Sequence, residues 1–214
     1  MREYHKIQTL FKRDMTKPNN PLIFGEWTCD EFQYLRHNEW DFTEKVDGTN
    51  IRIMWDGDNV RFGGKTDRAQ LPAPLVARLQ ELFPDDSGFR SVFEASDGGV
   101  CLYGEGYGHG IQKAGRLYCA HQDFILFDVR VGEWWLKRSD VRDIGTKLGL
   151  DVVPGVGSGT LDDCIATVER GFTSTFGNFE AEGIVARPSV ELKARNGERI
   201  IAKIKHRDFA TQNA

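Results

Sequence analysis

The chain of 214 residues carries 28 Lys and Arg against 32 Asp and Glu, a formal net charge of -4, and 40% of its residues are hydrophobic. This composition excludes a disordered tail, and the acidic total argues against a protein that holds nucleic acid by bulk positive charge alone. Its apolar runs fall far short of the roughly 18 residues of a membrane span, and its N-terminus does not resemble a signal peptide. We therefore expect a soluble protein of the reducing cytoplasm.

The secondary-structure signals predict an α+β fold of mostly antiparallel sheets flanked by helices. Short β-branched and aromatic runs predict strands, and apolar residues at helical spacing predict helices. In chain order we expect strands at 42–46, 50–55 and 60–62, a helix at 74–83, strands at 99–104 and 123–131, an extended segment at 134–137, a helix capped by Ser139 that ends at 148, a helix from Thr160 to Gly171, a strand at 182–185, and a terminal hairpin of 190–194 and 199–205.

Two glycine-rich stretches, 104–110 and 155–159, are interpreted as turns. Neither precedes the Gly-Lys-Ser/Thr of a P-loop, and neither forms the strand-to-helix fingerprint of a dinucleotide site. The chain contains no internal repeat, low-complexity segment or long linker. We therefore expect one domain over residues 1–214.

The sharpest local feature is Glu44-Lys45-Val46-Asp47-Gly48-Thr49-Asn50, in which a lysine lies between two carboxylates at the end of a predicted strand. On its own this pattern is also typical of a hairpin with a charged turn. Four further blocks follow in order: Gly104-Glu105-Gly106, Phe127-Asp128, Glu182-Gly183-Ile184-Val185 and Lys203-Ile204-Lys205. Five such blocks in this order arise by chance far less often than the first block alone.

In this order the blocks resemble the covalent nucleotidyltransferase superfamily of polynucleotide ligases and mRNA capping enzymes, most closely the phage-type ATP-dependent RNA ligases that seal breaks in duplex RNA. Lys45 matches the lysine that becomes adenylylated in that family. Asn50 stands where DNA ligases usually carry arginine, which favours an RNA ligase. The resemblance implies the ATP-grasp-like nucleotidyltransferase fold, in a single adenylyltransferase domain without a separate C-terminal OB-fold or helical domain.

The chemistry of such enzymes explains why three lysines are needed. A neutral lysine amine attacks the α-phosphorus of ATP and forms a Lys-AMP phosphoramidate while pyrophosphate leaves. By the resemblance, Lys203 and Lys205 favour the neutral form of Lys45 and offset negative charge on the α-phosphate. The alternative is a strand that alternates exposed lysines with a buried Ile204.

The resemblance also implies how the nucleotide is bound. Glu105 would accept hydrogen bonds from the ribose hydroxyls, and Phe127 and Val185 would cover the two faces of adenine. The alternatives are a charged turn residue and two core residues. The full set of expected nucleotide-binding residues is Glu44, Val46, Asp47, Gly48, Asn50, Lys65, Glu105, Phe127 and Val185.

Metal and RNA contacts complete the expected site. Glu182 and Asp128 would bind Mg²⁺ or Mn²⁺, which prefer carboxylate oxygens and water. Lys65 stands where the family usually has an arginine, so Arg61 or Arg68 would share its contacts with the nucleic acid. The segment 193–207 holds six basic residues and one acid, and this +5 edge, which ends at Arg207, would contact RNA.

These observations predict an ATP-dependent RNA ligase that joins 3′-hydroxyl and 5′-phosphate RNA ends through a lysine-AMP intermediate and an AMP-capped RNA end. The alternatives are a DNA ligase, a capping-type nucleotidyltransferase, and a non-catalytic module that binds nucleic-acid ends. The resemblance further implies a role in RNA repair, a phage-encoded protein acting in the host cytoplasm, and room for a partner protein that supplies extra grip on RNA.

Overall fold

The computed structural model describes residues 3–93 and 99–210 of the chain, which form two compact units. Unit 1 comprises Met1–Tyr4 and Asp47–Val153, and unit 2 comprises His5–Val46 and Pro154–Ala214. Unit 2 is therefore assembled from two segments that lie far apart in the sequence. The boundary between the units falls inside the first motif, directly after Val46.

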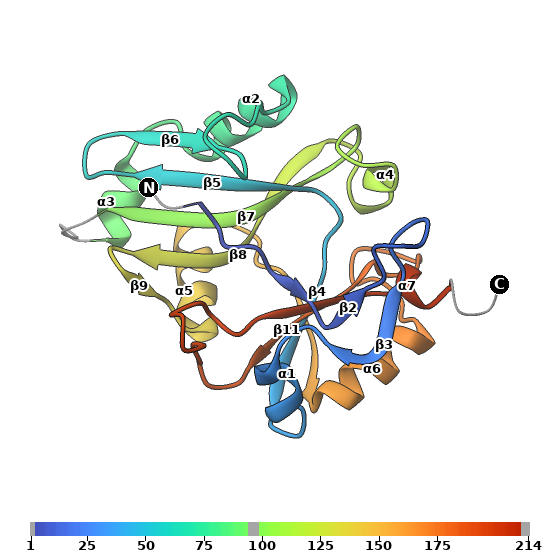
Figure 1. Ribbon diagram of the computed structural model, residues 1–214. Coiled ribbons are helices and arrows are strands. Elements are labelled where there is room, and N and C mark those ends of the chain that lie inside the picture. The colour runs from blue at the N-terminus through green and yellow to red at the C-terminus, as the bar shows by residue number, and fades with distance from the viewer. Residues whose placement is uncertain (1–2, 94–98, 211–214) are drawn as a thin grey trace. The chain divides into compact units, whose positions relative to one another are not determined.

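Unit 1 is built on a five-stranded sheet in the order β6-β5-β7-β8-β9, with every neighbouring pair antiparallel (Figure 1). Its helices are short, and α2 and α5 pack on β8. The elements are β5 (Thr49–Trp55), β6 (Val60–Gly63), α2 (Ala73–Leu82), α3 (Ser87–Val92), β7 (Val100–Gly108), α4 (Gly115–Tyr118), β8 (Gln122–Val131), β9 (Trp134–Trp135) and α5 (Arg138–Leu148).

The core of unit 1 follows from the helical and strand periodicities. Leu75 and Leu79, four residues apart on α2, are fully buried, as are Ile51 and Ile53 on one face of β5. Side chains at i and i+4 share a helix face, and those at i and i+2 share a strand face. The two apolar faces therefore close on each other.

Unit 2 contains a five-stranded sheet in the order β1-β12-β11-β4-β10 and a separate pair, β2-β3. The pair β1-β12 is parallel, whereas β12-β11, β11-β4 and β4-β10 are antiparallel. The elements are β1 (Gln8–Thr9), β2 (Phe11–Arg13), β3 (Leu22–Trp27), α1 (Asp30–Tyr34), β4 (Trp40–Glu44), β10 (Gly155–Gly159), α6 (Leu161–Arg170), β11 (Gly183–Pro188), β12 (Ala202–Lys205) and α7 (Arg207–Ala210).

The predicted α+β class is confirmed, and the strongest local signals place their elements within a few residues. Thr160 forms a capping box with Asp163 at the start of α6, and Gly149 adopts the left-handed conformation that ends α5. Both satisfy backbone groups that a helix end leaves unpaired. The predicted cap at Ser139 is wrong, because α5 begins at Arg138 after Lys137.

Three other predictions about elements are wrong. The stretch 155–159 is strand β10, paired with β4, and β7 continues through the first part of 104–110 as far as Gly108. A Cβ on Gly104 would lie 2.2 Å from the Phe124 ring, so glycine here permits close strand packing rather than a turn. Segment 190–194 is not a strand: it forms a single bridge with Arg199, while β12 pairs with β11 instead.

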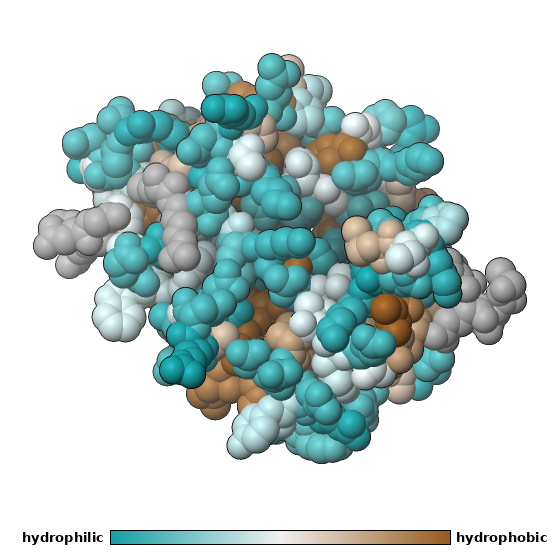
Figure 2. Space-filling view, viewed as in Figure 1, coloured by the Kyte–Doolittle hydropathy of each residue, from teal (hydrophilic) through white to brown (hydrophobic). Residues whose placement is uncertain are grey.

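The surface is mostly polar. Figure 2 shows one face on which hydrophilic side chains predominate. The exposed large hydrophobic residues are spread along the sequence, and include Met15, Tyr34, Leu117, Trp134 and Val190. None of the helices in residues 3–93 and 99–210 has the length and hydrophobicity needed to cross a membrane.

Candidate active site

Lys45 and Lys205 project from one face of the sheet in unit 2, with Gly183 between them. The backbone nitrogen of Lys45 donates to the carbonyl of Gly183 at 2.9 Å, and Gly183 is the register partner of Lys205. Residues directly opposite each other on neighbouring strands share a face of the sheet. Strand pairing thus joins two lysines that lie at opposite ends of the sequence.

The carboxylate of Glu182 lies between these two lysines. Its Oε2 accepts a hydrogen bond from Lys45 Nζ at 2.6 Å, and its Oε1 lies 2.6 Å from Lys205 Nζ. The side chains of Lys45, Glu182 and Lys205 are only 19%, 11% and 17% exposed. The Lys205 contact is an ion pair that is poorly directed for a hydrogen bond, since Oε1 is buried without a hydrogen-bond donor among the described residues. The cluster carries one net positive charge in a largely water-shielded position.

Gly183 permits the close strand spacing at this point. Its φ of +154° lies in a region that side chains rarely adopt, and a Cβ would be 2.1 Å from the carbonyl oxygen of Ile204. Only glycine has access to both that conformation and that approach. The glycine after Glu182 is therefore a packing requirement of β11 against β12.

Lys203 and Val185 form the next row on the lysine face. Val185 is the register partner of both Lys203 and Thr43, and Lys203 also pairs with Thr9 of β1. Both side chains are half-buried, whereas Ile204 is buried in the core. The structure thus brings together five of the predicted residues of unit 2: Lys45, Glu182, Val185, Lys203 and Lys205.

Glu44 lies on the opposite face of the same sheet. It is the register partner of Ile184 and is 1% exposed. Its carboxylate accepts hydrogen bonds from Ser174 Oγ at 2.6 Å, Thr175 N at 2.8 Å and Thr175 Oγ1 at 2.7 Å. The Glu44 side chain is therefore engaged on the face opposite the lysines. Val46, two residues further along, is also buried.

In unit 1 the remainder of the first motif lies against the glycine-rich part of β7. Asn50 is the register partner of Glu105, and a Cβ on Gly48 would lie 2.2 Å from the carbonyl oxygen of Gly106. The Asn50 Oδ1 atom is buried without a hydrogen-bond partner among the described residues. Asp47, which precedes Gly48, is half-buried. The structure thus groups Gly48, Asn50 and Glu105, as the motif order predicts.

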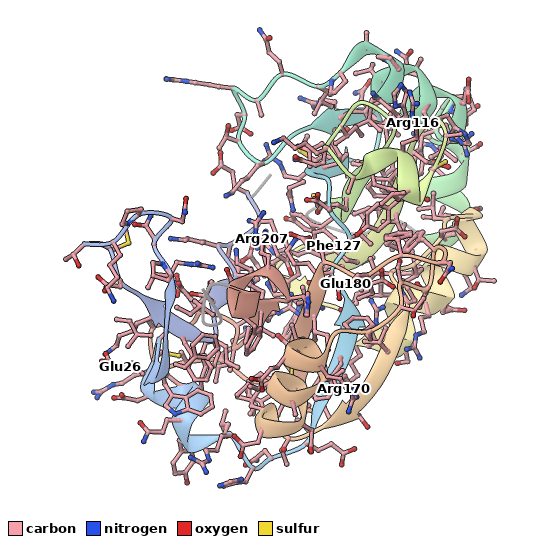
Figure 3. The ribbon with its side chains drawn as sticks, turned by 90° about the vertical axis from the view of Figure 1, so that its right-hand side faces the viewer. Glu26, Arg116, Phe127, Arg170, Glu180 and Arg207 are labelled. Carbon is pink, nitrogen blue, oxygen red and sulfur yellow. The ribbon has the colours of Figure 1, made fainter. Side chains whose placement is uncertain are left out.

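Phe127 and Asp128 on β8 have different environments. Phe127, labelled in Figure 3, is half-buried and meets the Tyr4 ring edge-on at 5.0 Å between centroids. Asp128 is fully buried, and its carboxylate accepts a hydrogen bond from the Tyr4 hydroxyl at 2.8 Å. Tyr4 is a contributor to this region that the motif pattern did not indicate.

Metal ligands were predicted at Glu182 and Asp128. Within 3–93 and 99–210, no group of three or more His, Cys, Asp or Glu side chains is arranged to hold a metal ion. Mg²⁺ is usually bound by one or two carboxylates together with substrate phosphates and water. The buried Oε1 of Glu182, which lacks a hydrogen-bond donor, fits a single carboxylate contact of that kind.

The loop that carries Lys65 is held by a buried arginine. Arg52 is 0% exposed; its Nε donates to the carbonyl of Gly64 at 2.8 Å and its Nη2 to Asp67 at 2.7 Å. The hydrogen bond and charge of Arg52 lower the pKa of the Asp67 carboxyl. The sequence signal for Arg52 is a charged residue within the mostly apolar run of β5.

The predicted RNA-contacting arginines differ in their availability. Lys65 and Arg68 are exposed, while Arg61 is exposed but ion-paired with Asp56. Arg207, labelled in Figure 3, is exposed at the start of α7. The basic edge predicted at 193–207 is smaller than its sequence charge, because Arg199 is buried and ion-paired with Glu191, a residue outside that segment.

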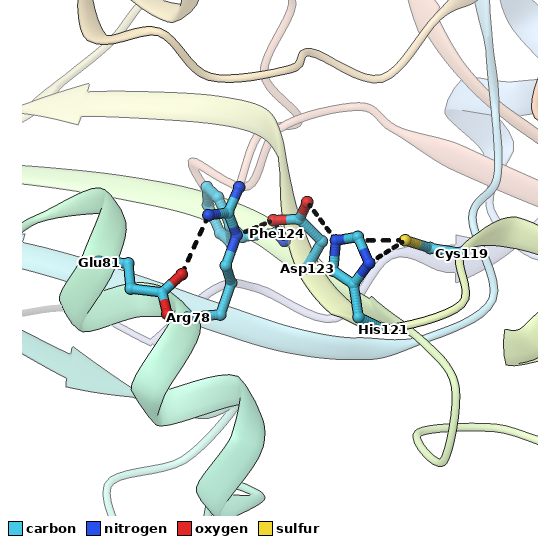
Figure 4. A network of polar contacts seen from close by, with 6 residues as sticks. All are labelled: Arg78, Glu81, Cys119, His121, Asp123 and Phe124. Atoms are coloured by element: carbon cyan, nitrogen blue, oxygen red, sulfur yellow. Dashed lines mark hydrogen bonds and ion pairs between the residues drawn. The ribbon is translucent and has the colours of Figure 1, made fainter.

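A second polar network in unit 1 contains Cys119 (Figure 4). The Cys119 sulfur lies 3.4 Å from His121 Nδ1, and His121 Nε2 lies 3.6 Å from Asp123. Asp123 in turn accepts a hydrogen bond from Arg78 Nε at 3.0 Å, and this interaction raises the pKa of the Arg78 guanidinium. The network places the Cys119 sulfur in contact with an imidazole.

We expect an alkylating reagent such as iodoacetamide to modify Cys119 before the other cysteines at pH 7.5. Burial raises the pKa of Cys29, that of Cys101 to about 11 and that of Cys164 to about 12. A raised thiol pKa means that the reactive thiolate forms only at higher pH. Peptide mass spectrometry over time measures the order, and His121→Gln should slow the reaction at Cys119. First modification of Cys29 would contradict the prediction.

Comparison with known proteins identifies the family and shows which solved structures have a similar fold. A family model described as RNA ligase matches residues 38–205, while no curated protein matches the sequence. Among solved structures, a lysine-to-alanine variant of Naegleria gruberi RNA ligase with ATP and Mn has a TM-score of 0.68 at 15% identity, covering 97% of this chain and 61% of that chain. A lysine-to-methionine variant of the same Naegleria gruberi enzyme, with AMP and Mn, has a TM-score of 0.65 at 15% identity. The match covers 85% of this chain and 54% of that chain.

At these identities the structural likeness concerns the fold, which is that of an RNA ligase nucleotidyltransferase. The chain spans between about half and three-fifths of the length of the Naegleria chains that it matches. The family model, in contrast, covers most of this chain and every one of the five motif blocks. The chain therefore belongs to the RNA ligase family.

Proposed function

We propose that this chain is an ATP-dependent RNA ligase in which Lys45 carries AMP. The Lys45–Glu182–Lys205 cluster is the observation that carries the proposal, because it joins a shielded lysine to a second cation and a carboxylate. In the first step Lys45 Nζ attacks the α-phosphorus of ATP, a nitrogen–phosphorus bond forms, and pyrophosphate leaves with the electrons of the broken bond. AMP then passes to a 5′-phosphate of RNA, and a 3′-hydroxyl attacks that end and releases AMP.

The proton on Lys45 is the main obstacle to the first step. Only the neutral amine has the lone pair needed for attack, and a carboxylate in contact with an amine favours its charged form. Attack therefore requires Glu182 to give up its hydrogen bond from Lys45. Glu182 would release this hydrogen bond on binding a divalent cation, whose charge would take the place of the Lys45 ammonium beside the carboxylate.

Lys205 and Lys203 act on the phosphate. They stand in neighbouring rows on the same face of the sheet as Lys45. Their positive charges therefore disfavour a third ammonium at Lys45, and they attract the negative charge that develops on the α-phosphate. Positioning of this kind accounts for most of the catalysis of phosphoryl transfer. The divalent ion, held by Glu182 and by phosphate oxygens, would supply charge neutralisation when bound.

For the nucleotide we propose that Glu105 binds the ribose hydroxyls and that the exposed part of Phe127 and the side chain of Val185 contact adenine. The unpartnered Oδ1 of Asn50 supports a polar contact at the start of β5. The Glu44 side chain is not included, since it is engaged on the other face of the sheet. Asp128 is the weaker metal ligand, because its carboxylate is buried and accepts a hydrogen bond from Tyr4.

For the substrate we propose breaks in duplex RNA, as in the phage-type ligases that the motif blocks resemble. The exposed Lys65, Arg68 and Arg207 support contacts with phosphates. We further propose that one adenylyltransferase domain carries the reaction in the cytoplasm, with further grip on RNA coming from its own surface or from a partner protein. A DNA ligase and a capping-type enzyme remain the competing assignments.

The proposal is tested by mass spectrometry after incubation with ATP and either Mg²⁺ or Mn²⁺. We expect a mass increase of one AMP, released by acid as a phosphoramidate is, and mapped to the peptide that contains Lys45. Parallel reactions with GTP separate a capping-type enzyme. Joining assays on nicked RNA, nicked DNA and single-stranded RNA then identify the substrate. The absence of an adduct with every nucleoside triphosphate would refute the proposal.

A further inference from the structure

Glu182 reaches the lysines from a hairpin that spans residues 172–181. The two arms of the hairpin pair through Ser174 N to Phe179 O at 2.8 Å and Ala181 N to Phe172 O at 2.9 Å. The second arm runs directly into Glu182. The position of the Glu182 carboxylate therefore depends on how this hairpin, which is largely outside the main sheet, is attached to it.

Glu44 provides one attachment. Its carboxylate accepts the hydrogen bonds from Ser174 and Thr175 described above, three in all, near the tip of the hairpin. Ser174 Oγ accepts in turn from the backbone nitrogen of Phe176 at 3.2 Å. A buried carboxylate with three donors is strongly tied to its partners, because each lost bond would leave a charge without compensation.

His206 provides a second attachment at the other end of the hairpin. Its Nε2 lies 3.1 Å from Glu180 Oε1, its Nδ1 lies 2.7 Å from the carbonyl of Val168, and its backbone nitrogen donates to the carbonyl of Glu182 at 2.9 Å. Glu180 is labelled in Figure 3. Glu44 immediately precedes Lys45, and His206 immediately follows Lys205. The sequence neighbours of both lysines thus hold the segment that places Glu182 between them.

We propose that Glu44 is a positioning residue for Glu182, which it fixes against Lys45 from the opposite face of the sheet through Ser174 and Thr175. The expected effect of Glu44 on adduct formation rests on the proposed function. Its expected effect on the position of the Glu182 carboxylate does not. The Glu44 carboxylate thus has a role other than nucleotide contact. His206 holds the other end of the same hairpin.

The experiment compares Glu44→Gln, Thr175→Val and Glu182→Gln with the parent chain. Glutamine preserves the size of Glu44 but loses its charge and cannot accept from three donors with one oxygen. The first measurement, made without ATP, is the rate at which a small amine-reactive reagent labels Lys45, followed by peptide mass spectrometry. The second is the rate of AMP adduct formation at saturating ATP over a series of Mn²⁺ concentrations.

We expect the two rates to change in opposite directions. In Glu44→Gln, Lys45 should be labelled at least about threefold faster, approaching Glu182→Gln, because Glu182 no longer shields the amine. Adduct formation should be at least about tenfold slower and should need more Mn²⁺, because the carboxylate is misplaced. Thr175→Val removes only one of the three hydrogen bonds to Glu44, so it should shift both rates in the same directions by a smaller factor. In a variant that combines Glu44→Gln with Thr175→Val, the effects on each rate should be less than additive.

Two controls separate positioning from loss of stability. Glu169→Gln removes an exposed carboxylate from α6 and should change neither rate. Labelling of Lys147, which is exposed on α5, controls for the activity of the reagent and should be constant in all variants. Circular dichroism of each variant reports loss of folded structure. If Glu44→Gln and Thr175→Val leave Lys45 labelling unchanged, the inference is wrong, whatever happens to adduct formation. If the parent chain forms no adduct, the proposed function fails, and the labelling comparison still decides the role of Glu44.

Discussion

A Lys45→Arg variant is expected to form no adduct with AMP, whereas the parent chain is expected to become adenylylated. Arginine keeps the positive charge that pairs with Glu182, so the cluster with Lys205 and the local fold should persist. The guanidinium cannot lose its proton under physiological conditions and so offers no lone pair to the α-phosphorus. Intact-protein mass spectrometry after incubation with ATP and Mn²⁺ measures the adduct, and we expect a loss below detection.

The choice of arginine makes the result informative. Lys45→Ala would also abolish the adduct, but it would leave Glu182 with one cation fewer and would combine a chemical with a structural change. Lys147→Arg, on the surface of α5, is the matched control and should be adenylylated like the parent. An adduct that persists in Lys45→Arg would place the nucleophile on another residue, and peptide mapping would identify it.

A Gly183→Ala variant is expected to be destabilised by at least about 3 kcal/mol in its free energy of unfolding. The added methyl would lie 2.1 Å from the Ile204 carbonyl oxygen and 2.8 Å from the Lys205 Cα atom. These contacts are with backbone, which cannot move aside without separating β11 from β12. The positive φ adds a further cost for any residue with a side chain. Urea titration followed by circular dichroism measures the change.

Gly197→Ala distinguishes the two causes. Gly197 also lies in unit 2 and has a positive φ of 83°, but a Cβ there would meet nothing within 4 Å. It should therefore show the cost of backbone conformation alone, about 1 kcal/mol. Equal losses in the two variants would mean that the strand contact at Gly183 does not contribute. Adduct formation by Gly183→Ala should also fall, since the lysines on β12 lose their register.

The sequence predicted those elements of the fold whose signals are local. The apolar spacing of Leu75 and Leu79 placed α2, and the Thr160 capping box placed α6, because hydrogen bonds and burial within a few residues determine these elements. Strand pairing depends on residues far apart in sequence, so the partner of β12 was predicted wrongly. The Asn196-Gly197 turn does form, with Ala194 N donating to the carbonyl of Glu198, but its hairpin ends at Ile200. Beyond it β12 pairs with β11, whose apolar face the sheet buries, so tertiary packing rather than the turn decides the partner of β12.

For the site, the sequence blocks predicted a set of residues but not how those residues face one another. Consecutive residues of a strand point to opposite sides, so Glu44 and Lys45 cannot both direct their side chains to the nucleotide. The sequence alone does not say which of the two side chains does so. The contact of Glu182 with two lysines has no counterpart in the sequence pattern. It arises from the pairing of β4 with β11 and of β11 with β12, a relation that only the folded sheet contains.

The discontinuity of unit 2 determines when this cluster can form during synthesis. The sheet of unit 1 uses strands that follow one another along the chain, so its contacts become available as the ribosome delivers residues 47–153. In unit 2, β1 pairs with β12, so the pairing of Thr9 with Lys203 can form only after residue 203 has been synthesised. Long-range pairing of this kind is slow. A nascent chain therefore displays Lys45 well before Glu182 and Lys205 exist to enclose it, and the proposed nucleophile acquires its surroundings only when the last strand of the sheet has been made.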